Sequence, residues 1–265
     1  PYIESKFPNW EYKLQQKYFS IESNGKNVRE VREKLDSDGF VIFKDVLEYP
    51  VCDYIRDQLT ASPIFPQSSI FNKVVNIEDW RLQTSFDGVD KKVPKTYIYF
   101  CFPLYLIMFR VEVHLNWSII QPLLNYIQFD QIRWATLFAK AGCPEQMPHC
   151  DYLPNKPFHR PGHAPHGIIV ALEHDTKFVV WPMSHNMIRY FYAYKLFPVR
   201  SYATRHVLDL PKGSVLLFRH LLVHAGASYP DENVRIHAFL QDGCGAIPHN
   251  NSYKVQHRRE IPCGH

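Results

Sequence analysis

Two histidines and one aspartate lie at spacings that could hold a metal ion. His149 and Asp151 are separated by one residue, and His224 follows much later in the chain. In a β-strand, residues i and i+2 project from the same face, so His149 and Asp151 could reach one ion while Cys150 points away. Two imidazoles and one carboxylate form the ligand set of redox-active iron centres that keep open coordination positions. The sequence therefore predicts a mononuclear metal centre, with His224 supplied by a second strand.

An arginine after the second histidine adds a charged group to this set. Arg235 opens a strand-like run at residues 234–241, where alternation places Arg235, His237 and Phe239 on one face. We expect that face to line a barrel interior or the floor of a cleft. The planar guanidinium suits a bidentate ion pair with a carboxylate, so Arg235 indicates an acidic co-substrate.

The elements that must position these residues are short strands bounded by turn signals. Eight are expected, at residues 131–140, 146–152, 167–174, 177–184, 203–210, 214–220, 222–228 and 234–241. This pattern predicts a mainly β fold with flanking helices and a double-stranded β-helix core, of the jelly-roll or cupin-like kind. The metal ligands then fall on the second and seventh of these strands, and Arg235 falls on the eighth.

The rest of the chain is expected to support this core within a single domain of residues 1–265. Residues 1–130 should form a helical and loop region with a lid, residues 131–242 the core, and residues 243–265 a C-terminal tail. Within the first part we expect helices at 28–35 and 51–59, a strand at 40–46 and a long loop at 62–96. Trp80, Arg81 and Tyr97 could contact a substrate there, although surface packing is the commoner role. Residues 186–197 should form an aromatic helix.

The sequence resembles the Fe(II) and 2-oxoglutarate-dependent oxygenases, and within them the phytanoyl-CoA hydroxylase-like group. The resemblance covers about residues 28–60 and 131–242, and its motifs are the triplet at 149–151, the segment V-V-W-P-M-S-H at 179–185, the segment K-G-S-V-L-L-F at 212–218 and the start of the region at 35–43. Arg235 is similar in placement to the family's co-substrate arginine. Met183 stands where the group's segment has glycine, and Gly226 replaces a small hydroxyl residue.

This resemblance implies a cofactor, a co-substrate and a reaction. His149, Asp151 and His224 would hold Fe(II), and Arg235 would pair with the distal carboxylate of 2-oxoglutarate. The implied reaction uses O2, releases succinate and CO2, and hydroxylates a C–H bond of a small-molecule substrate, with ascorbate as a reductant. Secondary candidates for co-substrate contact lie near the strand before the triplet; they are Thr136, Lys140 and Gln146.

Other functions stay open at this stage. Oxidation or demethylation of a modified nucleic-acid base, as in AlkB-like or TET-like enzymes, would need a basic groove beside the iron, for which Arg200, Arg205, Arg258 and Arg259 are the candidates. The formal net charge of +4 is mild for a duplex-binding protein. A catalytically inactive jelly-roll binding protein and hydroxylation of a protein side chain are the further alternatives. Histidines at 154–166 could meet an anionic group of a substrate.

Composition favours an intracellular globular enzyme. With 46 % hydrophobic and 15 % aromatic residues among 265, the chain can bury one large core. No apolar stretch reaches the length of a membrane span. The six cysteines are scattered and too few for a disulfide scaffold, which together with ferrous iron favours the reducing cytosol or nucleus. The sequence does not define the oligomeric state.

Overall fold

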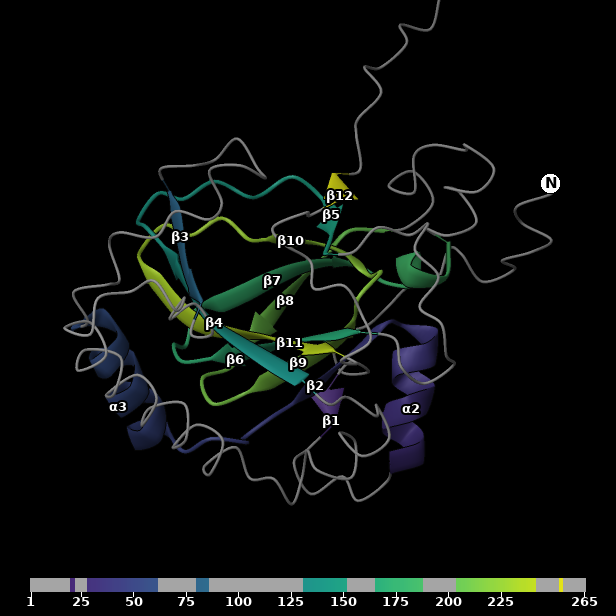
Figure 1. Ribbon diagram of the computed structural model, residues 1–265, viewed down its shortest axis with the longest axis horizontal. Coiled ribbons are helices and arrows are strands. Elements are labelled where there is room, and N and C mark those ends of the chain that lie inside the picture. The colour runs from purple at the N-terminus through teal and green to yellow at the C-terminus, as the bar shows by residue number, and fades with distance from the viewer. Residues whose placement is uncertain are drawn as a thin grey trace, which may run out of the picture.

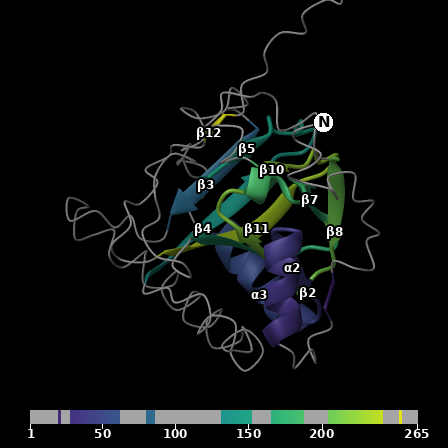
Figure 2. The same cartoon turned by 90° about the vertical axis from the view of Figure 1, so that its right-hand side faces the viewer.

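The protein is built on two β-sheets packed face to face (Figures 1 and 2). The computed structural model describes residues 20–21, 28–61, 80–85, 131–151, 165–187, 204–241 and 253–254. The seven-stranded sheet runs in the spatial order β1 (Ser20–Ile21), β2 (Phe40–Phe43), β9 (Val215–Arg219), β6 (His166–Ala171), β11 (Asn233–Gln241), β4 (Gln131–Ala139) and β3 (Arg81–Ser85). The five-stranded sheet runs β12 (Tyr253–Lys254), β5 (His149–Cys150), β10 (Val223–Gly226), β7 (Thr176–Trp181) and β8 (His206–Leu210).

The eight strands expected from the sequence correspond to β4 to β11, and each sheet contains four of them. All described strand pairs are antiparallel except β1 with β2. The predicted mainly β fold with a double-stranded β-helix core is therefore confirmed. The strand expected at 146–152 is shorter than predicted, because ladder pairing begins only at His149. A further strand, β3, lies inside the segment expected to be a loop.

Two helices cover the outer face of the seven-stranded sheet, and both lie in the lower half of the molecule as drawn in Figure 1. Helix α2 (Val28–Ser37) and helix α3 (Tyr49–Thr60) pack Leu35 and Ile55 into one buried cluster with strand residues such as Val170. Helix α3 starts before Pro50 and not after it as predicted, because proline fits the first turn, where its missing N–H has no helical partner.

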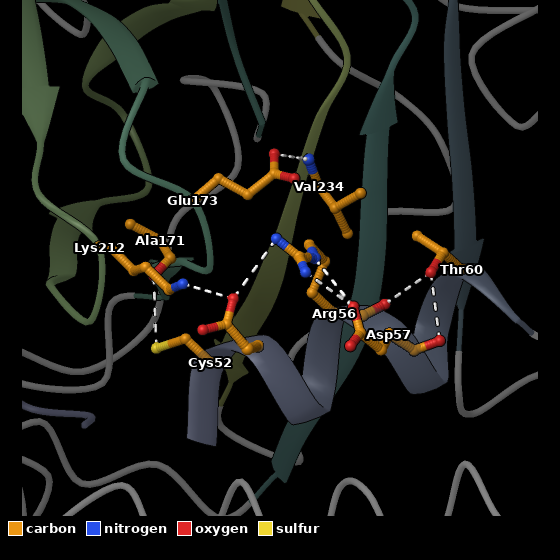
Figure 3. A network of polar contacts seen from close by, with 9 residues as sticks. Cys52, Arg56, Asp57, Thr60, Ala171, Glu173, Lys212 and Val234 are labelled. Carbon is orange, nitrogen blue, oxygen red and sulfur yellow. Dashed lines mark hydrogen bonds and ion pairs between the residues drawn. The ribbon is translucent and has the colours of Figure 1, made fainter. Parts of the chain in front are cut away.

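A polar network ties α3 to the sheet near the start of β11, as Figure 3 shows. Lys212 Nζ lies 2.5 Å from Asp53 Oδ1 of the helix, and the Lys212 side chain is nearly buried. Nearby, the backbone N–H of Val234 donates to the Glu173 carboxylate at 2.7 Å. Lys212 thus joins α3 to the turn before β9, and Glu173 joins the turn after β6 to the start of β11, immediately before Arg235.

Strand register decides which residues of β11 face the other sheet. Arg235 lies directly opposite Leu137 of β4 and Ala171 of β6, and these side chains share the inner face. Ile236 lies opposite Thr136 and faces the helices. The alternation predicted for Arg235, His237 and Phe239 therefore places them between the two sheets.

Several predictions concern residues outside the described ranges. They include most of the lid at 62–96 with Tyr97, most of the aromatic helix at 186–197, most of the histidine-containing segment at 154–166, Arg200, and nearly all of the C-terminal tail with Arg258 and Arg259. Within the described part of the chain, no helix is long and apolar enough to cross a membrane.

Candidate metal centre

His149 and His224 face each other across the pairing of β5 with β10. The two residues are direct partners in the antiparallel ladder, and their ring centroids are 4.5 Å apart. Asp151 follows the end of β5, and its Oδ1 lies 3.4 Å from His224 Nε2. One potential ligand atom from each of the three residues lies within 4.8 Å of the others. The predicted trio therefore meets around a common point.

Backbone carbonyls determine which ring nitrogen each histidine presents. His149 Nδ1 lies 2.8 Å from the Met147 carbonyl oxygen, and His224 Nδ1 lies 2.9 Å from the Leu222 carbonyl oxygen. A carbonyl can only accept a hydrogen bond, so each Nδ1 carries the hydrogen and each neutral ring keeps a lone pair on Nε2. This is the arrangement by which outer hydrogen bonds orient metal-ligating histidines. The three side chains thus fit a divalent metal ion.

The charges around the centre also suit a cation. Burial, with the neighbouring His224, lowers the pKa of His149 to about 4, so this imidazole is neutral at pH 7. Burial alone would lower the pKa of His224 and raise that of Asp151, but their mutual attraction and hydrogen bond prevail: the pKa of His224 is raised and that of Asp151 is lowered. A bound cation would replace the proton shared by His224 and Asp151, so metal binding would release a proton.

Aromatic rings of the interior enclose the His224 side. Phe178 stacks on the His224 ring at a centroid distance of 5.1 Å, and Phe218 meets it edge-on at 5.0 Å. Both phenylalanines are buried. Cys150, between the first two ligands, lies instead in the separate cluster that contains Val223, as expected for the residue that points away.

Arg235 lies on the opposing sheet, and its side chain is buried. Its Nη1 donates to Asn233 Oδ1 at 3.2 Å, and its guanidinium carbon lies 5.3 Å from the centroid of the Tyr229 ring. His237 lies two residues further along the same face; burial, the largest cause, lowers the pKa of its imidazole to about 4. Electrostatic interactions connect His237 with both Asp151 and Arg235, so its imidazole is close to the candidate metal ligands and to the guanidinium.

The three secondary candidates are placed differently. Gln146 is buried, and its Oε1 accepts the backbone N–H of Gly226 at 2.8 Å, two residues after His224. Thr136 lies on the helix-covered face of β4, because its partner in the ladder is Ile236. Lys140 is exposed just beyond the end of β4. The structure brings Gln146 to the site and places Thr136 and Lys140 away from it, which corrects their predicted grouping.

Arg81, expected in a loop as a possible substrate contact or, more commonly, as a surface residue, is buried on a strand. It lies on β3, with 2 % of its surface exposed, and its Nη2 donates to the carbonyl oxygens of Pro144 and Ala227. Burial and the charge of Arg235 lower the pKa of Arg81 to about 10. Trp80, named with it as a possible substrate contact, is 43 % exposed. The segment 81–85 has one apolar residue, so periodicity offered no signal for a strand.

Two facing sheets with a His-Asp-His cluster on one of them define the protein as a double-stranded β-helix with a candidate metal centre. Among solved structures, the chain is similar to the non-heme alpha ketoglutarate dependent carbocyclase SnoK from nogalamycin biosynthesis, with a TM-score of 0.56 and 15 % identity over 84 % of this chain and 87 % of that chain. It is also similar to the epimerase SnoN from nogalamycin biosynthesis, with a TM-score of 0.55 and 16 % identity over 83 % and 92 % of the two chains.

A third similar structure is a Pseudomonas putida prolyl-4-hydroxylase, with a TM-score of 0.50 and 11 % identity over 82 % of this chain and 99 % of that chain. At these identities the likeness establishes the shared fold. Comparison of the sequence with protein-family models and with curated proteins gives no match.

Proposed function

We propose that the protein is a non-haem Fe(II) and 2-oxoglutarate-dependent oxygenase. The observation that carries the proposal is the convergence of two histidine Nε2 atoms and the Asp151 carboxylate around one point. This donor set matches the facial triad typical of non-haem iron oxygenases. The similarity of the fold to proteins described as alpha ketoglutarate dependent supports the same assignment.

Each residue of the site would have a distinct part in this function. His149, Asp151 and His224 would hold the iron, which when bound supplies the activation of O2 that couples conversion of 2-oxoglutarate into succinate and CO2 to substrate oxidation. Arg235 would bind the distal carboxylate of 2-oxoglutarate through its planar donor groups. Phe178 and Phe218 would exclude water from the side of His224, which strengthens electrostatic interactions in the site.

The proposed reaction is hydroxylation of a C–H bond in a small molecule. The buried position of the ligands favours a substrate that enters an enclosed site, and the sequence segments at 179–185 and 212–218 favour the phytanoyl-CoA hydroxylase-like group. The solved structures of the same fold include an epimerase and a carbocyclase, so assays should detect other oxidation products as well. The intact set of ligands argues against an inactive binding protein.

The test is anaerobic titration with Fe(II), followed by measurement of succinate release against panels of lipids, amino acids and modified nucleosides. We expect one Fe(II) per chain in the parent, and in His149→Ala a loss of affinity greater than about 100-fold, since even outer hydrogen-bond partners contribute 10- to 100-fold. His174→Ala is the matched control, because His174 is exposed and, among the described rings, contacts only Tyr49, edge to face. Equal Fe(II) affinity in the parent and His149→Ala would refute the metal site.

A further inference from the structure

Two buried guanidinium groups lie close to one tyrosine ring. The guanidinium carbons of Arg81 and Arg235 are 5.9 Å and 5.3 Å from the centroid of the Tyr229 ring. Arg81 and Asn233 both pair with Ala139 of β4, so Arg81, Asn233 and Arg235 lie on the same inner face of the sheet. Strand β3 therefore adds a second positive charge beside the predicted co-substrate arginine.

Neither guanidinium has an acidic partner within the described part of the chain. Arg81 Nη2 donates to three backbone carbonyls, those of Pro144, Gly226 and Ala227, which fix the plane of the group, while Nε and Nη1 have no acceptor among the described residues. The same holds for Arg235 Nε. The carboxylate of Glu145 acts on Arg81 only through a coulombic interaction, and Glu145 is itself paired with the exposed Arg205. Buried charges are stable when they are paired, so these two cations favour an anion between them.

Gly226 shows where the donor groups of Arg81 lie relative to the metal ligands. Gly226 is two residues after His224 on the same strand, so its side-chain position faces the same way as His224. A Cβ atom at residue 226 would lie 2.6 Å from Arg81 Nη1 and 2.5 Å from Gln146 Oε1. Arg81 therefore lies against the face of β10 that carries His224. Any residue larger than glycine at position 226 would displace the Arg81 side chain.

We infer that Arg81 and Arg235 together bind the distal carboxylate of the co-substrate. This inference rests on the proposed function and names β3 as the part of the fold that completes the co-substrate site. Three donor atoms have no acceptor among the described residues and could bind the carboxylate: Arg81 Nε, Arg81 Nη1 and Arg235 Nε. The backbone carbonyls that hold Arg81 Nη2 keep those donors in place before the ligand arrives, so little side-chain entropy is lost on binding.

The experiment compares two acids that differ only at the distal end. In 2-oxovalerate a methyl group replaces the distal carboxylate of 2-oxoglutarate, while the 2-oxo acid end is unchanged. Affinities of both acids are measured by calorimetry on the Fe(II)-loaded protein without O2, for the parent, Arg81→Met, Arg81→Lys and Arg235→Met. Arg29→Met is the control for loss of an arginine charge, because Arg29 is exposed on α2. The ratio of the two affinities isolates the contact with the distal carboxylate.

We expect Arg81→Met to weaken 2-oxoglutarate binding by about 10- to 100-fold and 2-oxovalerate binding by less than about 3-fold, as for loss of a charge-assisted hydrogen bond. Arg81→Lys keeps the charge without the planar group and should give a smaller fall in the ratio. It also serves as the decisive variant if Arg81→Met does not fold. A ratio equal to that of the parent in the folded Arg81 variants overturns the inference.

The outcomes separate this inference from the proposed function. A parent protein that binds Fe(II) but does not prefer 2-oxoglutarate to 2-oxovalerate contradicts both. If Arg235→Met removes the preference and Arg81→Met retains it, the proposed function stands and only the assignment of Arg81 fails.

Discussion

At the scale of single residues, both histidines of the candidate metal centre are oriented by their own strands. Each ring donates from Nδ1 to the carbonyl oxygen two residues before it, Met147 for His149 and Leu222 for His224. The orientation is therefore a local property of β5 and β10. The sequence predicts which residues meet, because their types and spacing are visible, but the choice of ring nitrogen depends on backbone geometry that no pattern of residue types contains.

Two residues other than glycine in the described part of the chain have positive φ angles, Asp45 at 54° and Met183 at 65°. Met183 thus keeps the left-handed conformation at the position where the related segment has glycine. Its side chain packs against the buried cluster that contains Trp181, and these contacts offset the backbone strain. Asp45 is exposed and has no such contacts to lose.

We therefore predict that Asp45→Gly stabilises the protein by about 0.5 to 1 kcal/mol, because glycine adopts this φ without the steric conflict of a Cβ atom. Asp45→Ala should have the opposite effect, since alanine keeps the Cβ and lacks the local hydrogen bonding that aspartate offers. Urea unfolding at pH 7 measures both. Equal stability of the two variants would show that the φ angle of residue 45 is not a source of strain.

At the scale of elements, strand pairing controls the surroundings of the metal centre. Gly167 of β6 lies opposite Phe218 of β9, and the phenylalanine ring covers the glycine so closely that a Cβ there would lie 2.1 Å from Phe218 Cζ. The same ring lies edge-on to His224. The absence of a side chain at Gly167 thus determines the position of the Phe218 ring next to the candidate metal centre.

Gly167→Ala is expected to destabilise the protein by about 1 to 3 kcal/mol, as in other overpacked cores, and to weaken metal binding because the Phe218 ring must move. Phe218→Leu in the same chain makes room for the added methyl group. The double variant should therefore lose less free energy of unfolding than the sum of the two single variants. Additive losses in urea unfolding would mean that the ring does not press on residue 167.

Strands differ in how far the sequence could predict them. The eight core strands were recognisable because apolar residues alternate within them and turn residues separate them. Strand β3 was not, since its residues become a strand by pairing with the edge of β4 and not through an apolar face of their own. Arg81 was named as a possible substrate contact, but its burial on a strand was not predicted. Thr136 was grouped with the site because distance along the chain cannot tell the two faces of β4 apart.

At the scale of the whole molecule, buried histidines link stability to pH. Burial, the largest cause in each case, lowers the pKa to about 4 for His149 and His237 and to about 3 for His185. In the unfolded chain these groups titrate near the ordinary value of 6.5. Below that value and above the folded pKa, the unfolded state binds more protons, so stability falls as the pH falls. His224, whose folded pKa is raised, is charged in both states within this window and adds nothing to the slope.

We predict that the free energy of unfolding of the metal-free protein decreases by about 1.4 kcal/mol per pH unit for each such histidine between about pH 6 and about pH 5. His185→Gln removes one of these groups without changing any of the candidate metal ligands. The slope of stability against pH in this variant should be smaller by about one proton, whatever its absolute stability. Urea unfolding at several pH values measures both slopes, and parallel slopes would contradict the prediction.

The division of the site between the two layers has one more consequence. The candidate iron ligands lie on or next to strands of the five-stranded layer, and both arginines lie on the seven-stranded layer, so in the proposed function the co-substrate spans the interior. The width of that interior is maintained by contacts such as Phe178 with Phe218, whose rings are 5.3 Å apart. The distance between the two sheets would then select the chain length of the dicarboxylic acid, and the site should reject homologues of 2-oxoglutarate that are one methylene shorter or longer. Changing Phe178 would alter which chain length is accepted without removing any group that touches the acid.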